Sequence, residues 1–189
     1  FVACGWPLPG HEFRVVDEAN RELPDRREGR LQFRGPSSTA GYFRNAEATA
    51  TLFCNDWLDS GDYAYLSGGD VFLTGRAKDI IIKAGRNIYP QEIEDVLISH
   101  IQVRDVAVFG IPNAEFGEEV KAVVQPAHPD YQPWELQEEL IAYCRANLSH
   151  VKCPRSIDFM TDLPRHPNGK LYKAELRQPY WKSHSSNIL

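Results

Sequence analysis

The sequence lacks a long apolar run, a surplus of basic residues and any close pair of cysteines. No stretch is apolar over the roughly 20 residues that a membrane-spanning helix needs, and no secretory signal pattern is recognisable. The chain carries 21 Lys and Arg against 26 Asp and Glu, for a net charge of −5. Nucleic-acid-binding domains usually carry a basic footprint, so this balance argues against a nucleic-acid partner.

Cysteine is scarce and scattered. Cys4, Cys54, Cys144 and Cys153 form no Cys-x-x-Cys pair, so neither a zinc site nor a disulfide framework is indicated. Isolated thiols fit reduced core cysteines in a reducing compartment, and we expect a cytoplasmic protein. There is no internal repeat, and apolar and charged fractions of 42% and 25% are typical of an ordered globular chain.

The first part of the chain, residues 1–75, predicts short strands and turns. Alternating runs at 13–16 and 31–34 read as strands, and Asn45 is a candidate cap for a short helix. Two further runs flank a Ser-Gly-Gly-Asp sequence within residues 63–74, which is a strong hairpin signal. With no long helical pattern, these segments predict a small β-sheet or barrel.

The second part mixes helical and strand periodicity. Its order, β-α-β-β-α-β, is typical of a compact α+β domain. A loop and a short terminal helix from Leu171 follow, and we expect a frayed end at His184–Leu189. The predicted strands are 80–83, 103–109, 119–124 and 156–159, and the predicted helices are 90–99 and 133–147.

A charged joint, Lys78-Asp79, separates the two parts. A strand of isoleucines follows it, Gly85 supplies a turn, and Pro90 suits the first position of a helix. The sequence therefore predicts an α+β chain with a hinge: a small sheet or barrel subdomain at 1–78 and a compact α+β domain at 79–189.

Three polar residues stand out as candidates for chemistry. Asp62, in a Ser-Gly-Asp turn, could bind two vicinal sugar hydroxyls, and Arg76 could clamp a phosphate. Lys170, in a Pro- and Gly-rich loop, could neutralise charge on a transferring group. Each also has a plain structural reading, as turn Asp, surface ion-pair Arg and solvated turn Lys. His166 we interpret as loop structure.

Several segments follow one another along the chain as a set of motifs: Gly29–Gly35, Gly41–Thr49, Ser60–Asp62, Gly75–Asp79, Gly85, Pro90–Glu94 and Pro164–Lys170. Taken together, they resemble ordered motifs of the acyl-adenylate-forming enzymes, which include acyl-CoA synthetases, peptide-synthetase adenylation domains and luciferases. Residues 152–155 and 169–173 look most similar to those of bacterial fatty-acyl-CoA ligases or related acyl-CoA ligases.

The resemblance implies a two-step reaction. A carboxylic acid, fatty or aryl, attacks the α-phosphate of ATP to give acyl-AMP, and the thiol of CoA then displaces AMP. In that family pattern Asp62 and Arg76 bind the nucleotide, and Lys170 bridges the carboxylate and the α-phosphate. Asp79 matches the hinge about which a small C-terminal domain turns between steps, and Gly85 leaves room for the pantetheine arm of CoA.

The resemblance also implies missing parts. The family's phosphate loop, its Mg²⁺ ligands and its acyl pocket match no segment here, so we expect a C-terminal portion that is inactive without its N-terminal domain. We expect no metal ligands in this chain. Asn87 stands where some relatives carry a basic residue. Because Asn has no positive charge, the resemblance does not by itself imply that Asn87 contacts a substrate phosphate.

Two alternatives differ in the acceptor or in the chemistry. A fatty-acyl-AMP ligase would pass the acyl group to a carrier protein, and its relatives share a similar Gly85-Arg86-Asn87 turn. A non-catalytic nucleotide- or CoA-binding module would keep the shape without the reaction. A structural protein with coincidental turns is the third reading, and four ordered motifs speak against it.

Overall fold

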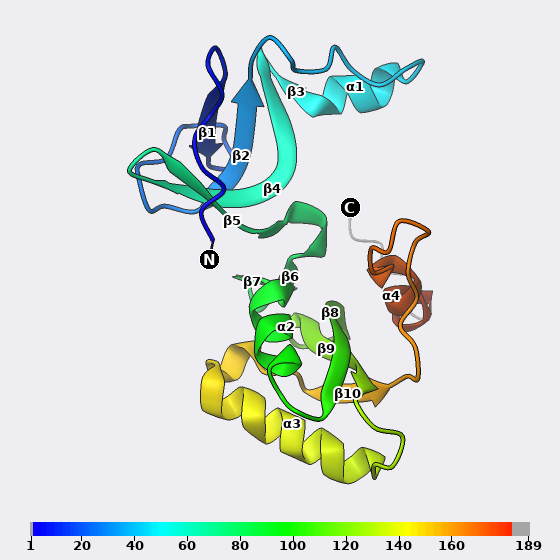
Figure 1. Cartoon of the computed structure of the whole chain (residues 1–189). Coiled ribbons are helices and arrows are strands. Elements are labelled where there is room, and N and C mark those ends of the chain that lie inside the picture. Colours follow the sequence, from blue (N-terminus) through cyan, green and yellow to red (C-terminus); the bar gives the residue numbers. More distant parts are fainter. Residues whose placement is uncertain (1, 183–189) are drawn as a thin grey trace. The chain divides into compact units, whose positions relative to one another are not determined.

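The structure, a computed structural model, describes residues 2–182 (Figure 1). The chain divides into two compact units, residues 1–78 and 79–189, which we describe one at a time. The predicted frayed end at 184–189 lies outside the described residues. The predicted α+β class is confirmed, since both helices and strands are present and the strands form two separate sheets.

The first unit is an antiparallel sheet with one short helix. Its strands run in the order β1-β2-β4-β3, with β5 also paired to β4. The long strand β4 is curved, and it pairs with β2, β3 and β5 (Figure 1). Its elements are β1 (Glu12–Val16), β2 (Gly29–Arg34), α1 (Ala46–Leu52), β3 (Phe53–Cys54), β4 (Trp57–Ser67) and β5 (Asp70–Arg76).

Local chemistry fixes the ends of these elements as expected. The Asn45 side chain accepts a hydrogen bond from the Ala48 amide at 3.0 Å, which caps α1. Gly68 and Gly69 both have positive φ, and they make the two-residue turn between β4 and β5. Val15, Leu31, Ala64 and Val71, one each from β1, β2, β4 and β5, pack together as a small core.

The sequence prediction was wrong about the surroundings of Asp62. We expected a turn, but Ser60, Gly61 and Asp62 lie inside β4. Gly61 has a φ of 73°, and the pairing with β5 shifts register just beyond Asp62. A glycine kink and a bulge therefore bend a continuous strand at this point, where the sequence alone suggested that the strand ended.

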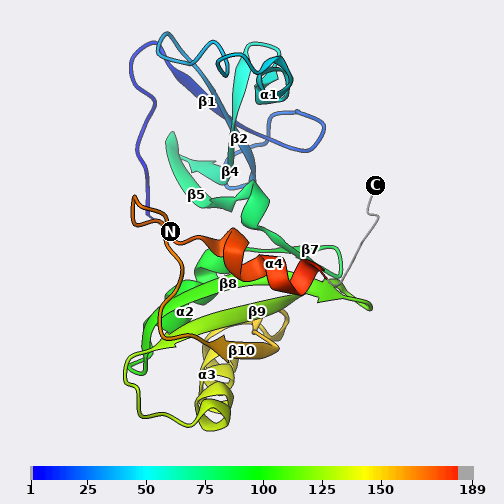
Figure 2. The ribbon, with the colours of Figure 1, turned by 90° about the vertical axis from the view of Figure 1, so that its right-hand side faces the viewer.

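The second unit is a mixed sheet covered on both faces. Strand β10 lies parallel to β9, β8 and β9 form a long antiparallel hairpin, and β6 joins β9 at one residue pair. Helices α2 and α3 cover one face, and α4 crosses the other (Figure 2). Its elements are β6 (Ile81–Lys83), β7 (Arg86–Ile88), α2 (Pro90–Ile98), β8 (Val103–Asn113), β9 (Gly117–Pro126), α3 (Pro133–Asn147), η2 (His150–Lys152), β10 (Ser156–Phe159) and α4 (Lys173–Lys182).

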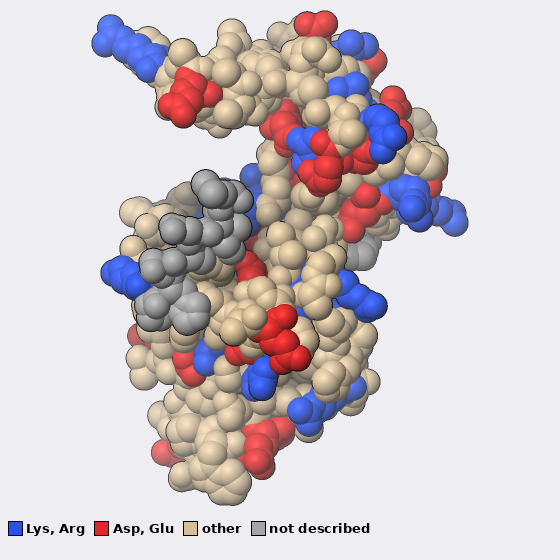
Figure 3. Space-filling view, turned by 180° about the vertical axis from the view of Figure 1, so that it is seen from behind, with Lys and Arg blue, Asp and Glu red and all other residues tan. Residues whose placement is uncertain are grey.

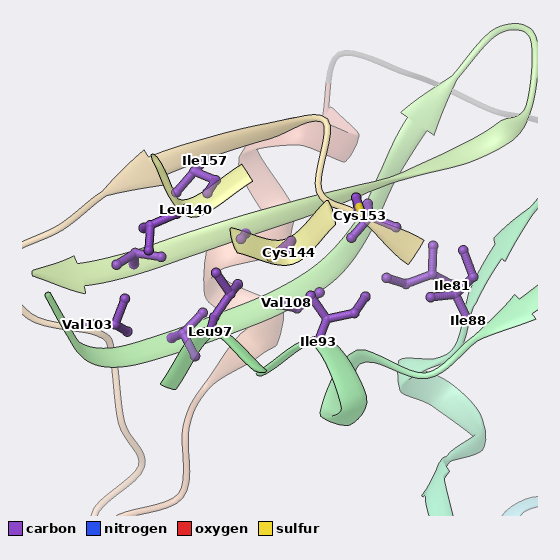
Figure 4. Packing of buried hydrophobic residues seen from close by; sticks show 14 of the residues in the cluster. Ile81, Ile88, Ile93, Leu97, Val103, Val108, Leu140, Cys144, Cys153 and Ile157 are labelled. Carbon is purple, nitrogen blue, oxygen red and sulfur yellow. The ribbon is translucent and has the colours of Figure 1, made fainter. Parts of the chain in front are cut away.

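The main core lies between the sheet and the first two helices. Leu97 from α2 and Leu140 from α3 are fully buried against Val108 and Ile157 (Figure 4). Burial of such a side chain stabilises the fold by about 1.5–3 kcal/mol each. On the other face a smaller cluster forms around Leu176 of α4. Both faces of this sheet therefore need their helices.

Two details of the second unit, and the burial of the cysteines in both units, differ from expectation. Strand β7 was missed, because its three residues lie between a turn and a helix start. Helix α4 begins at Lys173 rather than Leu171. Of the cysteines expected in the core, Cys144 and Cys153 are buried, whereas Cys4 is exposed and Cys54 is half-buried. All four are free thiols.

Candidate functional site

In the first unit, Asp62 and Arg76 form an ion pair. They lie opposite each other on β4 and β5, and Arg76 Nε is 2.9 Å from Asp62 Oδ1. The Ser60 hydroxyl accepts a hydrogen bond from the Asp62 amide at 3.0 Å and donates one to the Leu31 carbonyl, which holds the kinked backbone. The structure thus brings together two residues that the sequence singled out separately.

This pair retains capacity for a ligand. A carboxylate offers about four acceptor positions and a guanidinium five donors, and the pair uses one of each here. The Arg76 side chain is 56% exposed, so its guanidinium is accessible from solvent. Acceptor and donor side by side suit a ligand that combines vicinal hydroxyls with an anionic group.

The boundary between the units falls at the short helix η1 (Ala77–Asp79), between Lys78 and Asp79. None of the three residues is buried. Ala77 and Lys78 are exposed, and Asp79 is half-buried.

Gly85 lies at the tip of the hairpin formed by β6 and β7. Ala84 and Gly85 have φ values of 49° and 71°, as expected of a two-residue turn between the paired residues Lys83 and Arg86. The Ala84 amide donates to the Phe116 carbonyl at 2.8 Å, which ties the turn to the next hairpin. A Cβ at Gly85 would meet no atom within 4 Å, so the tip faces open space.

A cavity of about 420 Å³ lies beside this turn. Cationic side chains dominate the charge of its lining, with Glu119 as the acid, and Lys83 reaches across to the Val151 carbonyl at 3.1 Å. Such a lining suits an anionic ligand. The residues that line the cavity are Lys83, Ala84, Phe116, Glu119, Arg145, His150, Val151, Cys153, Pro154 and Arg155.

Lys170 lies near the end of a closed loop. A β-bridge joins Arg165 to Leu171, and the His166 amide donates to the Lys170 carbonyl at 2.8 Å. The Lys170 side chain is exposed, and its ammonium has no hydrogen bond or ion pair among residues 2–182. The loop therefore holds the backbone of Lys170 and leaves its charge available for a ligand.

His166 belongs to the loop structure, as expected. Its ring packs on that of Tyr172 with the centroids 4.1 Å apart, across the base of the loop. Gly169, which precedes Lys170, has a φ of 82° and donates its amide to the His166 carbonyl.

Sequence reasoning missed the ion pairs that hold this region. Lys173 at the start of α4 pairs with Glu94 of α2 at 2.6 Å, and Glu94 also accepts from the Val108 amide at 2.7 Å. Burial raises the pKa of the Glu94 carboxyl, although Lys173 and the Val108 amide oppose the rise. No local sequence signal marks such pairs, because their partners lie far apart in the chain.

No group of three or more His, Cys, Asp or Glu side chains among residues 2–182 is arranged to hold a metal ion. The described helices include none that is long and apolar enough to cross a membrane. On the face shown in Figure 3, positive and negative side chains are interspersed and form no single basic patch.

The fold and these loops define a class of protein. Residues 92–170 match the family model described as the AMP-binding enzyme C-terminal domain. The chain corresponds to a C-terminal portion of acyl-adenylate-forming enzymes, which confirms the resemblance drawn from the sequence.

Two similar proteins are ligases by name, and a third is a solved structure with bound ATP. The chain is 36% identical, over 93% of its length, to a long-chain-fatty-acid–CoA ligase of Escherichia coli, and covers 31% of that protein. It is 36% identical to ScoC of Streptomyces coeruleorubidus, a fatty acid–[acyl-carrier-protein] ligase, over 95% of the chain and 34% of ScoC. The ATP-bound crystal structure of MatB from Rhodopseudomonas palustris superposes with a TM-score of 0.85 at 35% identity, covering 94% of this chain and 35% of MatB. The chain thus spans about a third of the length of the relatives it matches.

Proposed function

We propose that the chain is the C-terminal portion of an AMP-forming acyl-CoA synthetase. A substrate carboxylate attacks the α-phosphate of ATP, and pyrophosphate leaves as acyl-AMP forms. The CoA thiolate then attacks the acyl carbon, and AMP leaves as the thioester forms. The observation that carries this proposal is the match, over more than nine-tenths of the chain, to acid–thiol ligases such as the Escherichia coli protein.

The geometry of the first unit supports a role in nucleotide binding. Asp62 accepts hydrogen bonds from the ribose hydroxyls, and the exposed guanidinium of Arg76 donates to the ribose or the phosphates. The existing ion pair between them orients both groups before the nucleotide arrives. In this proposal residues 1–78 are the last β-rich subdomain of a larger adenylate-forming domain.

Lys170 serves the adenylation step. Its free ammonium bridges the substrate carboxylate and the α-phosphate, and so offsets the negative charge that would keep the two anions apart. A lysine suits this task because its charge is compact and its stem is flexible. Residues 79–189 form a mobile domain that turns about Asp79 and exchanges Lys170 for the Gly85 turn between steps.

The second unit also supports a CoA acceptor. The open space at Gly85 admits the narrow pantetheine arm, and the neighbouring cavity offers Lys83, Arg145 and Arg155 to the phosphates of CoA. We infer that Mg²⁺ and the acyl pocket belong to the preceding domain, so that residues 1–189 alone turn over no substrate. Four free thiols support a cytoplasmic location.

A second candidate differs only in the acceptor. The similarity to ScoC, a fatty acid–[acyl-carrier-protein] ligase, is as high as that to the CoA ligase. In that case a carrier-bound pantetheine reaches acyl-AMP past the same turn. The cationic cavity favours free CoA, because a carrier-bound pantetheine lacks the nucleotide with its 3′-phosphate.

The deciding experiment is ATP–pyrophosphate exchange by the complete enzyme with a panel of fatty and aryl acids, followed by addition of CoA. We expect acid-dependent exchange and then a CoA thioester. Exchange without a thioester would favour the carrier-protein acceptor. An enzyme that exchanges with no acid would refute the ligase and leave a nucleotide- or CoA-binding module.

A further inference from the structure

One arginine ties the Lys170 loop to the body of the second unit. The guanidinium of Arg165 donates from Nη1 to the Gly169 carbonyl at 2.7 Å and pairs through Nη2 with the carboxylate of Asp105 on β8. Gly169 immediately precedes Lys170 in the chain. The two nitrogens of one planar fork therefore connect the backbone beside Lys170 to the central hairpin of the sheet.

Asp105, the residue on β8 to which Arg165 binds, is itself held in place. Asp105 Oδ1 accepts a hydrogen bond from the Val106 amide at 2.8 Å, which leaves Oδ2 for Arg165. The Asp105 side chain is only 23% exposed, so its position is set by the strand. A charged group held in this way determines where the guanidinium, and hence the loop, must lie.

A second ion pair near the loop, Lys173–Glu94, holds helix α4 rather than the loop itself. Lys173 and Glu94 fix the start of α4, three residues beyond Lys170, and neither of them bonds to the backbone of the loop. The peptide group between Gly169 and Lys170 is also held from within the loop, since the Lys170 amide donates to Asn168 Oδ1 at 3.1 Å. Arg165 is the contact that joins this peptide group to the sheet. The loop thus has one tie at its carboxyl end, through α4, and one at its base, through Arg165.

We propose that Arg165, held by Asp105, is a positioning residue that places Lys170 for the adenylation step. This inference rests on the proposed function of Lys170 and adds the residues that orient it. An arginine is needed because its fork makes two hydrogen bonds in fixed directions, whereas a lysine ammonium is a point charge on a flexible stem.

The first test needs no catalysis and uses the 189-residue chain. Hydrogen–deuterium exchange of peptides covering 165–171 is compared in the native chain, Arg165→Gln and Arg104→Gln. Arg104 is an exposed neighbour of Asp105 with no hydrogen bond or ion pair to the loop among residues 2–182, and its replacement by Gln removes the same charge. We expect faster exchange of the loop in Arg165→Gln alone, with β8 and β9 unchanged. Equal exchange in all three chains would overturn the proposal.

The second test measures the two half-reactions of the complete enzyme. Arg165→Gln should slow acyl-AMP formation about ten- to a hundredfold, as expected when a catalytic group is displaced by about 1 Å, and spare thioester formation from supplied acyl-AMP. Arg165→Lys should recover part of the lost rate. Asp105→Asn should resemble Arg165→Gln, and the double variant should be no worse than either, because the two side chains act as one unit.

The Lys170→Ala variant distinguishes a failure of the positioning role of Arg165 from a failure of the proposed role of Lys170. If it abolishes adenylation while Arg165→Gln does not, the positioning role is overturned and the proposed function stands. If Lys170→Ala leaves adenylation intact, the role of Lys170 falls, and the positioning role falls with it. Equal losses of both half-reactions in Arg165→Gln would indicate a general structural role and would also overturn the inference.

Discussion

Replacement of Gly85 by leucine tests whether glycine is needed there for the positive φ of the turn or for the passage of the pantetheine arm. The φ of 71° places Gly85 in the left-handed region, where an L-residue costs about 1–2 kcal/mol. The loss of a flexible glycine from the unfolded chain offsets about 0.4–1 kcal/mol of this. No atom lies within 4 Å of the new Cβ, so no clash adds to the strain. The second unit should therefore lose only about 1 kcal/mol of stability.

This loss of stability is small enough for the rates of the two half-reactions to be measured on folded enzyme. For a unit of this size, 1 kcal/mol lowers Tm by roughly 4–8 °C, which leaves the enzyme folded at 25 °C. If the pantetheine arm passes the turn, the leucine side chain occupies its path. Thioester formation from supplied acyl-AMP should then fall at least a hundredfold, far more than the loss of stability explains, while acyl-AMP formation remains within about twofold.

A matched control comes from the first unit. Gly68 has a φ of 63° in the same kind of hairpin turn, and a Cβ there also meets no atom within 4 Å. Gly68→Leu should cost its own unit a similar amount and leave both half-reactions intact. Thermal unfolding and the two half-reaction rates, measured on both variants, decide the matter. A Gly85→Leu enzyme with an unchanged thioester rate would remove Gly85 from the path of CoA.

Three further outcomes follow from the site and the core. Lys170→Ala should lower acyl-AMP formation about a hundred- to a thousandfold and spare thioester formation, measured as separate half-reactions; equal loss of both would refute its role. Arg155→Ala should raise the KM for CoA at least tenfold without a change in the KM for ATP, and a shift in both would contradict the proposed cavity. Burial raises the pKa of the Cys144 thiol to about 12, so the unfolded chain releases this proton from about pH 9 while the folded chain retains it. Stability should fall by about 1.4 kcal/mol per pH unit above pH 9, and Cys144→Ala should flatten that slope in urea titrations.

Features with local causes were predictable from the sequence. Asn45 caps a helix through its own side chain, Pro90 starts one through its fixed φ, and Gly85 forms a turn through its missing Cβ. Each cause lies within a few residues of its effect, so the sequence pattern is sufficient. The helical spacing of residues 133–147 likewise predicts a buried apolar stripe of Leu136, Leu140, Ile141, Cys144 and Leu148. In the structure Leu136, Leu140 and Cys144 are buried, whereas Ile141 and Leu148 are half-buried.

Features that depend on register or on distant partners were not predictable. The Asp62–Arg76 ion pair requires the kink at Gly61 and the shift in pairing just beyond Asp62, neither of which the composition of β4 reveals. Arg165 and Asp105 are 60 residues apart, and only the packing of the loop on the sheet brings them together. Sequence reasoning therefore singled out Gly85 and Lys170 as candidates and missed the residues that hold their loops in place.

The loops of Lys170 and Gly85 draw their order from separate interactions, and this predicts that the two half-reactions can be impaired independently. The Lys170 loop is held by the hydrogen bond from Arg165 and by the ion pair at the start of α4. The Gly85 turn is held by its positive φ values and by the hydrogen bond from the Ala84 amide to the Phe116 carbonyl. Because no residue belongs to both sets, their effects should add in free energy. An Arg165→Gln/Gly85→Leu enzyme should then show the adenylation rate of the first variant and the thioester rate of the second. A double variant that is much slower than this in either half-reaction would mean that the loops are coupled, and the alternation of one domain between two independent faces would have to be abandoned.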